Sequence, residues 1–226
     1  MDYEWYEVVD NTQKYTQGDI IEEFPVPTFV EKDEYPFYRP ANFTSDVVIM
    51  TQACDMQNDK TDYVTLCTLK NLEEYIIDVF DDMYQDRLST ARENAKETEG
   101  LDVFDISKGK YKNTVLKAID SLKKGEYVNF YLLNKYDDNG VKKGARVVLL
   151  DELYQVPKKS LENFLVSKDS SEKRLRLLPP YREHLSKAFA NVFGRIGLPL
   201  DVNVSDLKDS LQLPEKLCIN QLKESC

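Results

Sequence analysis

The stretch Lys173–Pro199 constrains the fold more than any other part of this chain. Charged and apolar side chains alternate from Arg174 to Leu177, which is typical of a half-buried strand. Pro179 and Pro180 end that strand, and a helix is predicted to begin directly after them at Tyr181. Gly197 is predicted to end this helix. Its apolar positions recur at helical spacing and form one face: Leu185, Ala188, Phe189, Val192, Phe193 and Ile196.

Length and composition limit the class of protein. The chain has 226 residues, of which 42% are hydrophobic, so one elaborated domain with a packed core is expected. No apolar run approaches the roughly 20 residues of a membrane-spanning helix. The acidic, polar start does not resemble a signal peptide, so we expect a cytoplasmic protein without membrane contact.

The sequence offers few ligands for a cofactor. It contains four cysteines without a C-x-x-C pair, and one histidine. A structural zinc site is therefore not expected. Phosphate-binding loops, dinucleotide fingerprints and calcium loops are also missing, and we expect no cofactor.

Charge is distributed unevenly along the chain. Residues 1–110 contain 25 acidic and 10 basic side chains, whereas residues 111–226 contain 15 acidic and 20 basic ones. Between Lys142 and Arg195 there are 12 basic and 6 acidic side chains. This basic C-terminal segment can bind RNA or DNA. The alternative is that the two halves fold together and neutralise each other.

Most of the remaining chain is predicted to form short strands in hairpins. Residues 2–9 have the composition of an edge strand. Asp46–Gln52 and Asp62–Leu69 are predicted to form one hairpin, and Glu126–Leu150 a second. Four prolines between Glu22 and Phe43 predict that this segment runs mostly as a surface loop.

Helical spacing begins at Leu72 and continues to Met83. The charged residues 84–112 are interpreted as a helical insert or a mobile excursion. A further helix is predicted for Thr114–Lys124, with Asn113 as its N-cap and Gly125 as its end. Another short helix is predicted for Lys158–Val166.

These elements together predict a single α+β domain that covers residues 1–226. The expected architecture is a small SH3-like antiparallel β-barrel, with a helical insert and a C-terminal helix packed on it. Barrel strands are assigned to residues 1–70 and 125–178. The helical insert is assigned to residues 71–124, and the C-terminal helical part to residues 179–226.

Residues 17–70 contain four short motifs: Gly18-Asp19-Ile20, Arg39-Pro40-Ala41, the strand Val47-Val48-Ile49, and a strand that ends near Thr68. With these motifs the segment resembles the PemK/MazF-like proteins, which are small SH3-like barrels. Many members of that family are toxins that cleave RNA. The resemblance implies an endoribonuclease whose catalytic residues are Arg39 and Thr68.

Two other motifs, Gln52-Ala53-Cys54-Asp55 and the helix start PPYREHLS, resemble a group of uncharacterised bacterial proteins. Cys54 follows a predicted buried strand, a position where functional groups are often presented. It can act as a nucleophile with His184 as its base and Asp55 or Glu183 as the orienting carboxylate. The alternative, which the sequence favours, is that Cys54 is a small buried hydrophobe and Asp55 caps the next turn.

The first turn of the late helix contains Tyr181, Arg182, Glu183 and His184. Free N–H groups at a helix start attract anions, so Arg182 and His184 can hold a phosphate or a carboxylate there. In the alternative reading, Glu183 only stabilises the helix start and His184 lies at the rim of the core.

Arg174 and Arg176 are predicted to project from one strand face, and with Lys187 and Arg195 they can form a surface for phosphate or an acidic partner. The alternative is a solvated face, or ion pairs with the acidic N-terminal half.

No complete catalytic set is present in the sequence. We therefore expect a non-enzymatic binding or assembly module of a bacterial cytoplasmic complex, with a protein partner. RNA or DNA is a further candidate partner through the basic C-terminal segment. The alternative is a toxin-like endoribonuclease that uses Arg39 and Thr68, or Arg182 and His184. We further expect the late helix to begin beside Cys54.

Overall fold

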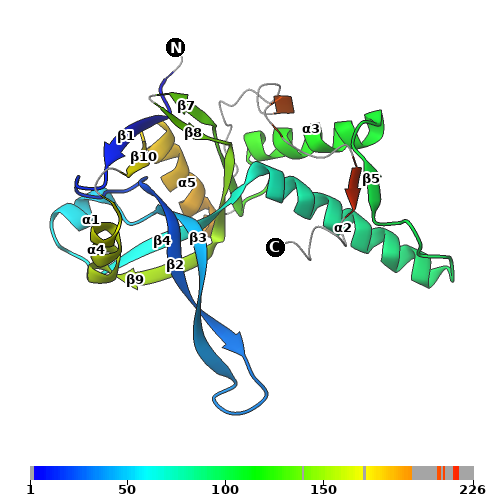
Figure 1. Cartoon of the computed structure of the whole chain (residues 1–226), viewed down its shortest axis with the longest axis horizontal. Coiled ribbons are helices and arrows are strands. Elements are labelled where there is room, and N and C mark those ends of the chain that lie inside the picture. Colours follow the sequence, from blue (N-terminus) through cyan, green and yellow to red (C-terminus); the bar gives the residue numbers. More distant parts are fainter. Residues whose placement is uncertain are drawn as a thin grey trace.

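The computed structural model describes residues 3–138, 140–169, 172–194, 208–209, 211 and 216–218. Its central element is a five-stranded antiparallel sheet with helices on both faces (Figure 1). The strand order is β2 (Ile20–Glu31), β3 (Tyr38–Ile49), β4 (Tyr63–Asn71), β9 (Arg146–Pro157) and β6 (Phe130–Leu133). No helix in the described residues is both long and apolar enough to cross a membrane.

Central strands have continuous apolar runs because both faces of the sheet are covered. Val47, Val48 and Ile49 on β3 are all completely buried. Successive strand residues point to opposite faces, so Val48 belongs to one core whereas Val47 and Ile49 belong to a second core. Helices α2 (Leu72–Glu93), α3 (Gly109–Lys124) and α5 (Tyr181–Gly194) contribute to the first core. Helices α1 (Ala53–Gln57) and α4 (Lys158–Ser167) contribute to the second.

Three smaller strand pairs surround this sheet. Strand β1 (Tyr6–Asp10) pairs with β10 (Lys173–Leu177), in agreement with the predicted edge strand and with the predicted strand before the two prolines. A single bridge between Asp19 and Arg176 connects β10 to the residue before β2. Strands β7 (Tyr136–Asp138) and β8 (Val141–Lys143) form a hairpin, and β5 (Val103–Asp105) pairs with β11 (Lys216–Cys218).

The predicted combination of an antiparallel sheet with separate helices is confirmed, but the barrel is not. Among the described strands, β2 and β6 are the two edges of the sheet, and no pairing joins them. A closed barrel turns one face of its sheet inward. Here each face is instead occupied by helices, so the sheet remains open.

The prediction of a surface loop between Glu22 and Phe43 is wrong. These residues form most of the long β2–β3 hairpin, which extends away from the rest of the molecule (Figure 1). Beyond the pair Phe24–Ser45, β3 no longer pairs with β4, so the hairpin is a two-stranded ribbon. A ribbon has two free edges, and prolines whose missing N–H faces such an edge do not disrupt pairing.

The helical insert lies where it was predicted, but the helices within it have different boundaries from those predicted. Helix α2 continues to Glu93 and α3 begins at Gly109, so residues 84–112 contain the ends of two helices and strand β5. Asn113 lies inside α3 rather than at its cap, because the chain enters the helix from Lys108 in extended conformation. Gly125 ends the helix as predicted, in left-handed conformation. The predicted helix end at Gly197 lies outside the described residues.

Candidate functional site

The two motifs that the sequence singled out meet at one surface cleft of about 510 Å³. Gln52, Ala53 and Cys54 line it from the end of β3 and the start of α1. The first turns of α5 line the opposite side. The α5 residues of the lining are Arg182, Glu183, Ser186 and Lys187. The structure thus places the beginning of α5 beside Cys54.

Gln17 connects the two sides of this cleft. Its side-chain amide donates one hydrogen bond to the backbone oxygen of Met50 (3.3 Å) and another to Oγ of Ser186 (2.9 Å). The hydroxyl of Ser186 in turn donates to the backbone oxygen of Arg182 (2.8 Å). The end of β3 and the first turns of α5 are therefore held together by side chains that line the cleft.

Gly18 is required in the loop before β2, where the backbone packs against Arg182 of α5. Its φ of +83° is in the left-handed region, and a Cβ there would lie 3.2 Å from Cγ of Arg182 and 3.1 Å from Cβ of Leu177. Both the backbone conformation and the close approach of Arg182 therefore favour glycine.

The polar groups in the cleft do not form a catalytic set. The thiol of Cys54 is exposed and lies 3.6 Å from Oε1 of Gln52 and 3.7 Å from Oδ1 of Asp55. His184 is not among the lining residues, and its ring lies edge-on to Tyr181 at 6.2 Å between centroids. The proposed pair of Cys54 and His184 is therefore not assembled in this cleft.

The guanidinium of Arg182 is already paired within the cleft. Its Nη2 and Nε lie 2.6 and 3.0 Å from Oε1 of Glu183. An anion would have to compete with this carboxylate. The arrangement therefore suits hydrogen bonding to a polar ligand better than binding of a highly charged one. Among the described residues, no group of three or more His, Cys, Asp or Glu side chains is arranged to hold a metal ion.

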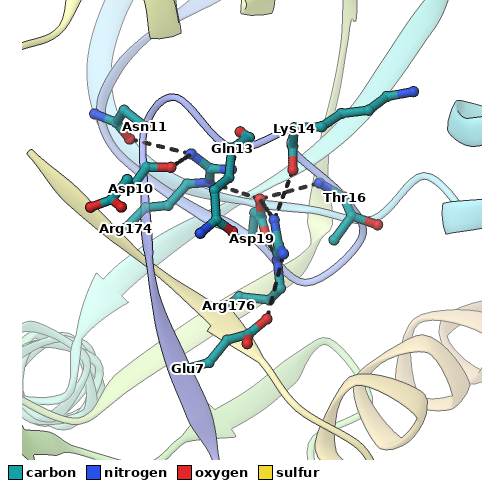
Figure 2. A network of polar contacts seen from close by, with 9 residues as sticks. All are labelled: Glu7, Asp10, Asn11, Gln13, Lys14, Thr16, Asp19, Arg174 and Arg176. Atoms are coloured by element: carbon teal, nitrogen blue, oxygen red, sulfur yellow. Dashed lines mark hydrogen bonds and ion pairs between the residues drawn. The ribbon is translucent and has the colours of Figure 1, made fainter. Parts of the chain in front are cut away.

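Arg174 and Arg176 are bonded to Asp19 rather than presented on a ligand-binding surface (Figure 2). The carboxylate of Asp19 is fully buried and accepts hydrogen bonds from both arginines. Nε of Arg174 lies 2.8 Å from Oδ2, and Nε of Arg176 lies 2.5 Å from Oδ1. The hydrogen bond to Asp19 raises the pKa of Arg176.

The same arginines fix the loop that carries Gln17 and Gly18. Arg174 donates to the backbone oxygens of Asp10 (2.9 Å) and Gln13 (2.6 Å), and Arg176 donates to that of Lys14 (2.9 Å). Charge-assisted hydrogen bonds are among the strong ones. The two arginines that were predicted to bind a ligand therefore hold the loop that carries Gln17 in place. This outcome agrees with the alternative interpretation, in which both arginines pair with the N-terminal half of the chain.

Other basic residues of the C-terminal segment also pair with acidic residues from the N-terminal half. Arg146 is nearly buried, with Nη1 3.6 Å from Glu22 and 3.4 Å from Asp46. Lys143 lies 2.7 Å from Glu22, and Lys168 lies 3.4 Å from Glu23. At these positions the two halves of the chain fold together and neutralise each other, which is the alternative to a free basic patch.

Arg39 and Thr68 are far apart. Thr68 pairs with Val47, and Arg39 lies eight residues before Val47 on the same continuous strand. At about 3.3 Å per residue the separation is roughly 26 Å. Thr68 is also buried, and its hydroxyl donates to Glu152 (2.5 Å). These two residues cannot act together on one scissile bond.

Within the described part of the chain, sequence reasoning missed a group of exposed aromatic side chains on the far half of the β2–β3 hairpin. We call residues 28–41 the arm tip. Four of its aromatic side chains are more than half exposed: Phe29 (68%), Tyr35 (84%), Phe37 (60%) and Tyr38 (51%). The available signal was the alternation of Phe24 and Val26 with prolines, which is a strand pattern with period two.

Comparisons of the chain with protein-family models, with curated proteins and with solved structures each find no match. The resemblance to PemK/MazF-like proteins stays a prediction.

Proposed function

We propose that this protein is a non-enzymatic binding module of a bacterial cytoplasmic complex, and that its arm tip docks into an apolar cleft of a protein partner. The four exposed aromatic side chains of the arm tip support this function most directly. Exposed apolar patches of this kind mark interaction surfaces, and buried aromatic anchors dominate the energetics of such interfaces.

The arm tip is already ordered without a partner. Phe29 and Tyr38 lie edge-to-face across the two strands (5.1 Å between centroids), and Tyr35 and Phe37 do so in the turn (6.1 Å). The backbone N–H of Lys32 donates to the oxygen of Phe37 (3.0 Å), and that of Phe37 to Glu34 (2.7 Å). Because these contacts restrict the arm tip before it docks, docking costs less entropy than it would for an unstructured loop.

Charge on the arm tip favours a protein over a nucleic acid. Glu31, Asp33 and Glu34 are balanced only in part by Lys32 and Arg39. Binding to a phosphate backbone requires an excess of positive charge. The exposed aromatic side chains and the small negative net charge of the arm tip instead suit an apolar cleft of a protein, with neutral or basic residues around its rim.

A photo-crosslinking residue in place of Tyr35, introduced in the native host, tests the proposal. We expect one dominant crosslinked protein, identified by mass spectrometry and then purified for affinity measurement. The double variant Tyr35→Ser/Phe37→Ser should weaken that affinity at least about tenfold, as for other aromatic anchors. Tyr63→Ser is the matched control, because Tyr63 is 54% exposed and lies at the start of β4, outside the arm tip.

Two results would contradict docking to a separate partner. One is a crosslink yield at position 35 no higher than at position 63. The other is a crosslink to a second copy, together with a doubled mass in light scattering that the double variant abolishes.

The toxin-like endoribonuclease is supported less well. It requires an SH3-like barrel, whereas the described sheet is open. It also requires a joint site for Arg39 and Thr68, whereas Arg39 lies near one end of β3 and Thr68 of β4 pairs with Val47 near the other end. We expect RNA to remain intact after incubation with the purified protein.

A further inference from the structure

Strand β1 has one unpaired edge in the described part of the molecule. It pairs with β10 along its other edge, and no further strand joins this pair except through the single bridge from β10 to Asp19. An exposed strand edge is a template for an added strand, and proteins commonly protect such edges with lysine, proline or a bulge. Residues Tyr6–Asp10 contain none of these protections.

The hydrogen-bond register identifies which residues face this open edge. Leu178 N donates to Trp5 O (2.9 Å), and Asn11 N donates to Glu172 O (3.3 Å). In an antiparallel pair, alternate residues exchange hydrogen bonds with the partner strand. Odd-numbered residues of β1 therefore face β10, and Tyr6 and Val8 direct their N–H and C=O groups away from it.

A groove of about 670 Å³ runs along this edge. Its walls are β1 and the start of the β7–β8 hairpin, which lies beside β1 in Figure 1. Tyr6 contacts that hairpin: its hydroxyl donates to Asn134 O (2.6 Å), and its ring lies edge-on to Tyr136 at 5.9 Å. Both walls are thus held in place, and the groove is part of the folded surface.

The groove is acidic. Five carboxylate side chains line it, against two lysines, and two of the five already have an ion-pair partner: Glu7 with Arg176 and Asp137 with Lys142. The carboxylates are those of Glu4, Glu7, Asp10, Asp137 and Asp138. A negative potential of this kind attracts basic ligands and repels nucleic acids.

We infer that β1 accepts an extended, lysine- or arginine-rich segment of a partner protein as an added strand. Backbone groups of Val8, which is partly exposed, pair with the incoming segment, whereas Tyr6 is only 4% exposed and serves to hold the strand in place. The surrounding carboxylates select for basic side chains. This is the general mode of strand addition, in which main-chain bonds supply affinity and side chains supply specificity. The site goes beyond the proposed docking of the arm tip and does not depend on it.

A second copy of this chain is a poor occupant. Pairing of two β1 edges would bring Glu4, Glu7 and Asp10 of one copy close to the same carboxylates of the other. Like charges across a strand pair destabilise it. Charge therefore favours a basic partner segment over self-association.

The test uses the full chain and a fluorescent octapeptide of alternating lysine and valine with blocked ends, measured by anisotropy. We expect saturable binding of this peptide and none of the glutamate–valine counterpart. A second lysine–valine peptide, N-methylated on the backbone of every residue, keeps the charge but has no N–H donor on either edge and cannot complete the pairing. It should bind about tenfold more weakly, which corresponds to the loss of one or two hydrogen bonds.

Two variants examine the protein side. Val8→Pro removes a donor from the open edge and leaves the bonds to β10 intact, because Val8 does not exchange hydrogen bonds with Leu175. It should weaken binding about tenfold. Glu4→Lys should weaken binding about threefold through charge, whereas the matched control Glu34→Lys, on the arm tip, should leave it unchanged.

Equal binding of the N-methylated and unmodified peptides would overturn strand addition, whether or not Val8→Pro folds. Equal binding of the acidic peptide would overturn the choice of a basic partner. A peptide-free dimer that dissociates in Val8→Pro would show that a second copy is the occupant instead.

Discussion

At the scale of single residues, Asp19 has the largest structural consequence. It is completely buried, and its two carboxylate oxygens are bonded to Arg174 and Arg176, while its Oδ2 also accepts the backbone N–H of Thr16 (3.2 Å). A buried ion pair adds little when intact, but removing one partner leaves an uncompensated charge in the interior.

Asp19→Asn should therefore destabilise the protein strongly. The amide places an NH₂ group against a guanidinium and removes the negative charge. We expect the free energy of unfolding to fall by about 3–5 kcal/mol. Urea titration followed by circular dichroism measures this.

Glu7→Gln is the control for this substitution. Among the described residues, Glu7 forms its one ion pair with Arg176, at 3.4 Å, and its side chain is 46% exposed. An exposed pair contributes about 1 kcal/mol or less. A comparable loss of stability in both variants would mean that burial of Asp19 has no special energetic role.

Two cysteines differ in environment and should differ in reactivity. Cys54 is exposed, whereas burial, with the nearby charges of Asp151 and Glu152, raises the pKa of Cys67 to about 12. Only the thiolate reacts with alkylating agents. We expect iodoacetamide to modify Cys54 and not Cys67 between pH 7.5 and 9.0 in the native protein. Tryptic mapping separates the two sites, because Lys60 lies between them.

The raised pKa of Cys67 also predicts how stability depends on pH. An unfolded chain loses the thiol proton near the ordinary value of about 8.5, whereas the folded chain retains it. Above this pH the unfolded state binds fewer protons, so the contribution of Cys67 to stability decreases as the pH rises from about 8.5 towards 12. Equal alkylation of Cys67 and Cys54 at pH 9.0 would contradict this environment.

At the scale of elements, helix α3 offers a matched pair of glycines. Gly125 ends the helix with φ +65°, in the left-handed region. Gly109 is the first residue of the helix, and a Cβ added there meets nothing within 4 Å. We expect Gly125→Ala to lower the free energy of unfolding by about 1 kcal/mol and Gly109→Ala to leave it unchanged or raise it slightly. Thermal denaturation of both variants decides this, and equal shifts would contradict the assigned helix end.

Elements with a strong local pattern could be predicted from the sequence, and α5 is the best example. Its apolar face and the two preceding prolines defined its start, and Leu185 is buried while Ala188, Phe189 and Val192 pack against the same core. The start of α3 was placed five residues late because Gly109 was interpreted as a break. Glycine at the first position of a helix costs little when nothing else interrupts the helix.

The β2–β3 hairpin could not be predicted in the same way, because its pairing depends on how the two strands lie in the folded molecule. Prolines 25, 27 and 40 argue against a central strand, and they do not argue against a ribbon with two free edges. Only the register, which pairs Pro25 with Thr44 and Pro27 with Asn42, shows that each proline is compatible with the ladder. The same limit applies to the open sheet, since strand composition does not reveal whether the two edges meet.

At the scale of the whole molecule, the candidate site combines a local signal with a long-range one. The sequence indicated both the residues around Cys54 and the start of α5, and we expected the two to adjoin. It did not indicate Gln17, which bonds to Ser186 across 169 positions in the chain. Nor did it identify Asp19 as the partner of arginines more than 150 positions away. Such pairs leave no periodic pattern in one sequence, so only the fold reveals them.

The helical insert and the sheet share one core, and this predicts a single cooperative unfolding transition. Phe80 of α2 and Ile119 of α3 belong to the same buried cluster as Tyr131 of β6 and Leu185 of α5. Removing apolar contacts in the insert should therefore weaken the sheet as well. Figure 1 shows α2 and α3 reaching away from the sheet, so an independent insert is the alternative that a measurement must distinguish.

The single tryptophan provides the required probe, because Trp5 stacks on Tyr181 at 3.7 Å between centroids, outside the insert. We expect urea transitions of Trp5 fluorescence and of far-ultraviolet circular dichroism to coincide. Ile119→Ala should shift both midpoints equally, through a loss of about 2–5 kcal/mol. Val166→Ala, at an 85% exposed position on α4, should shift neither. If Ile119→Ala moves only the circular dichroism midpoint, the insert unfolds by itself and the shared cluster does not couple it to the sheet.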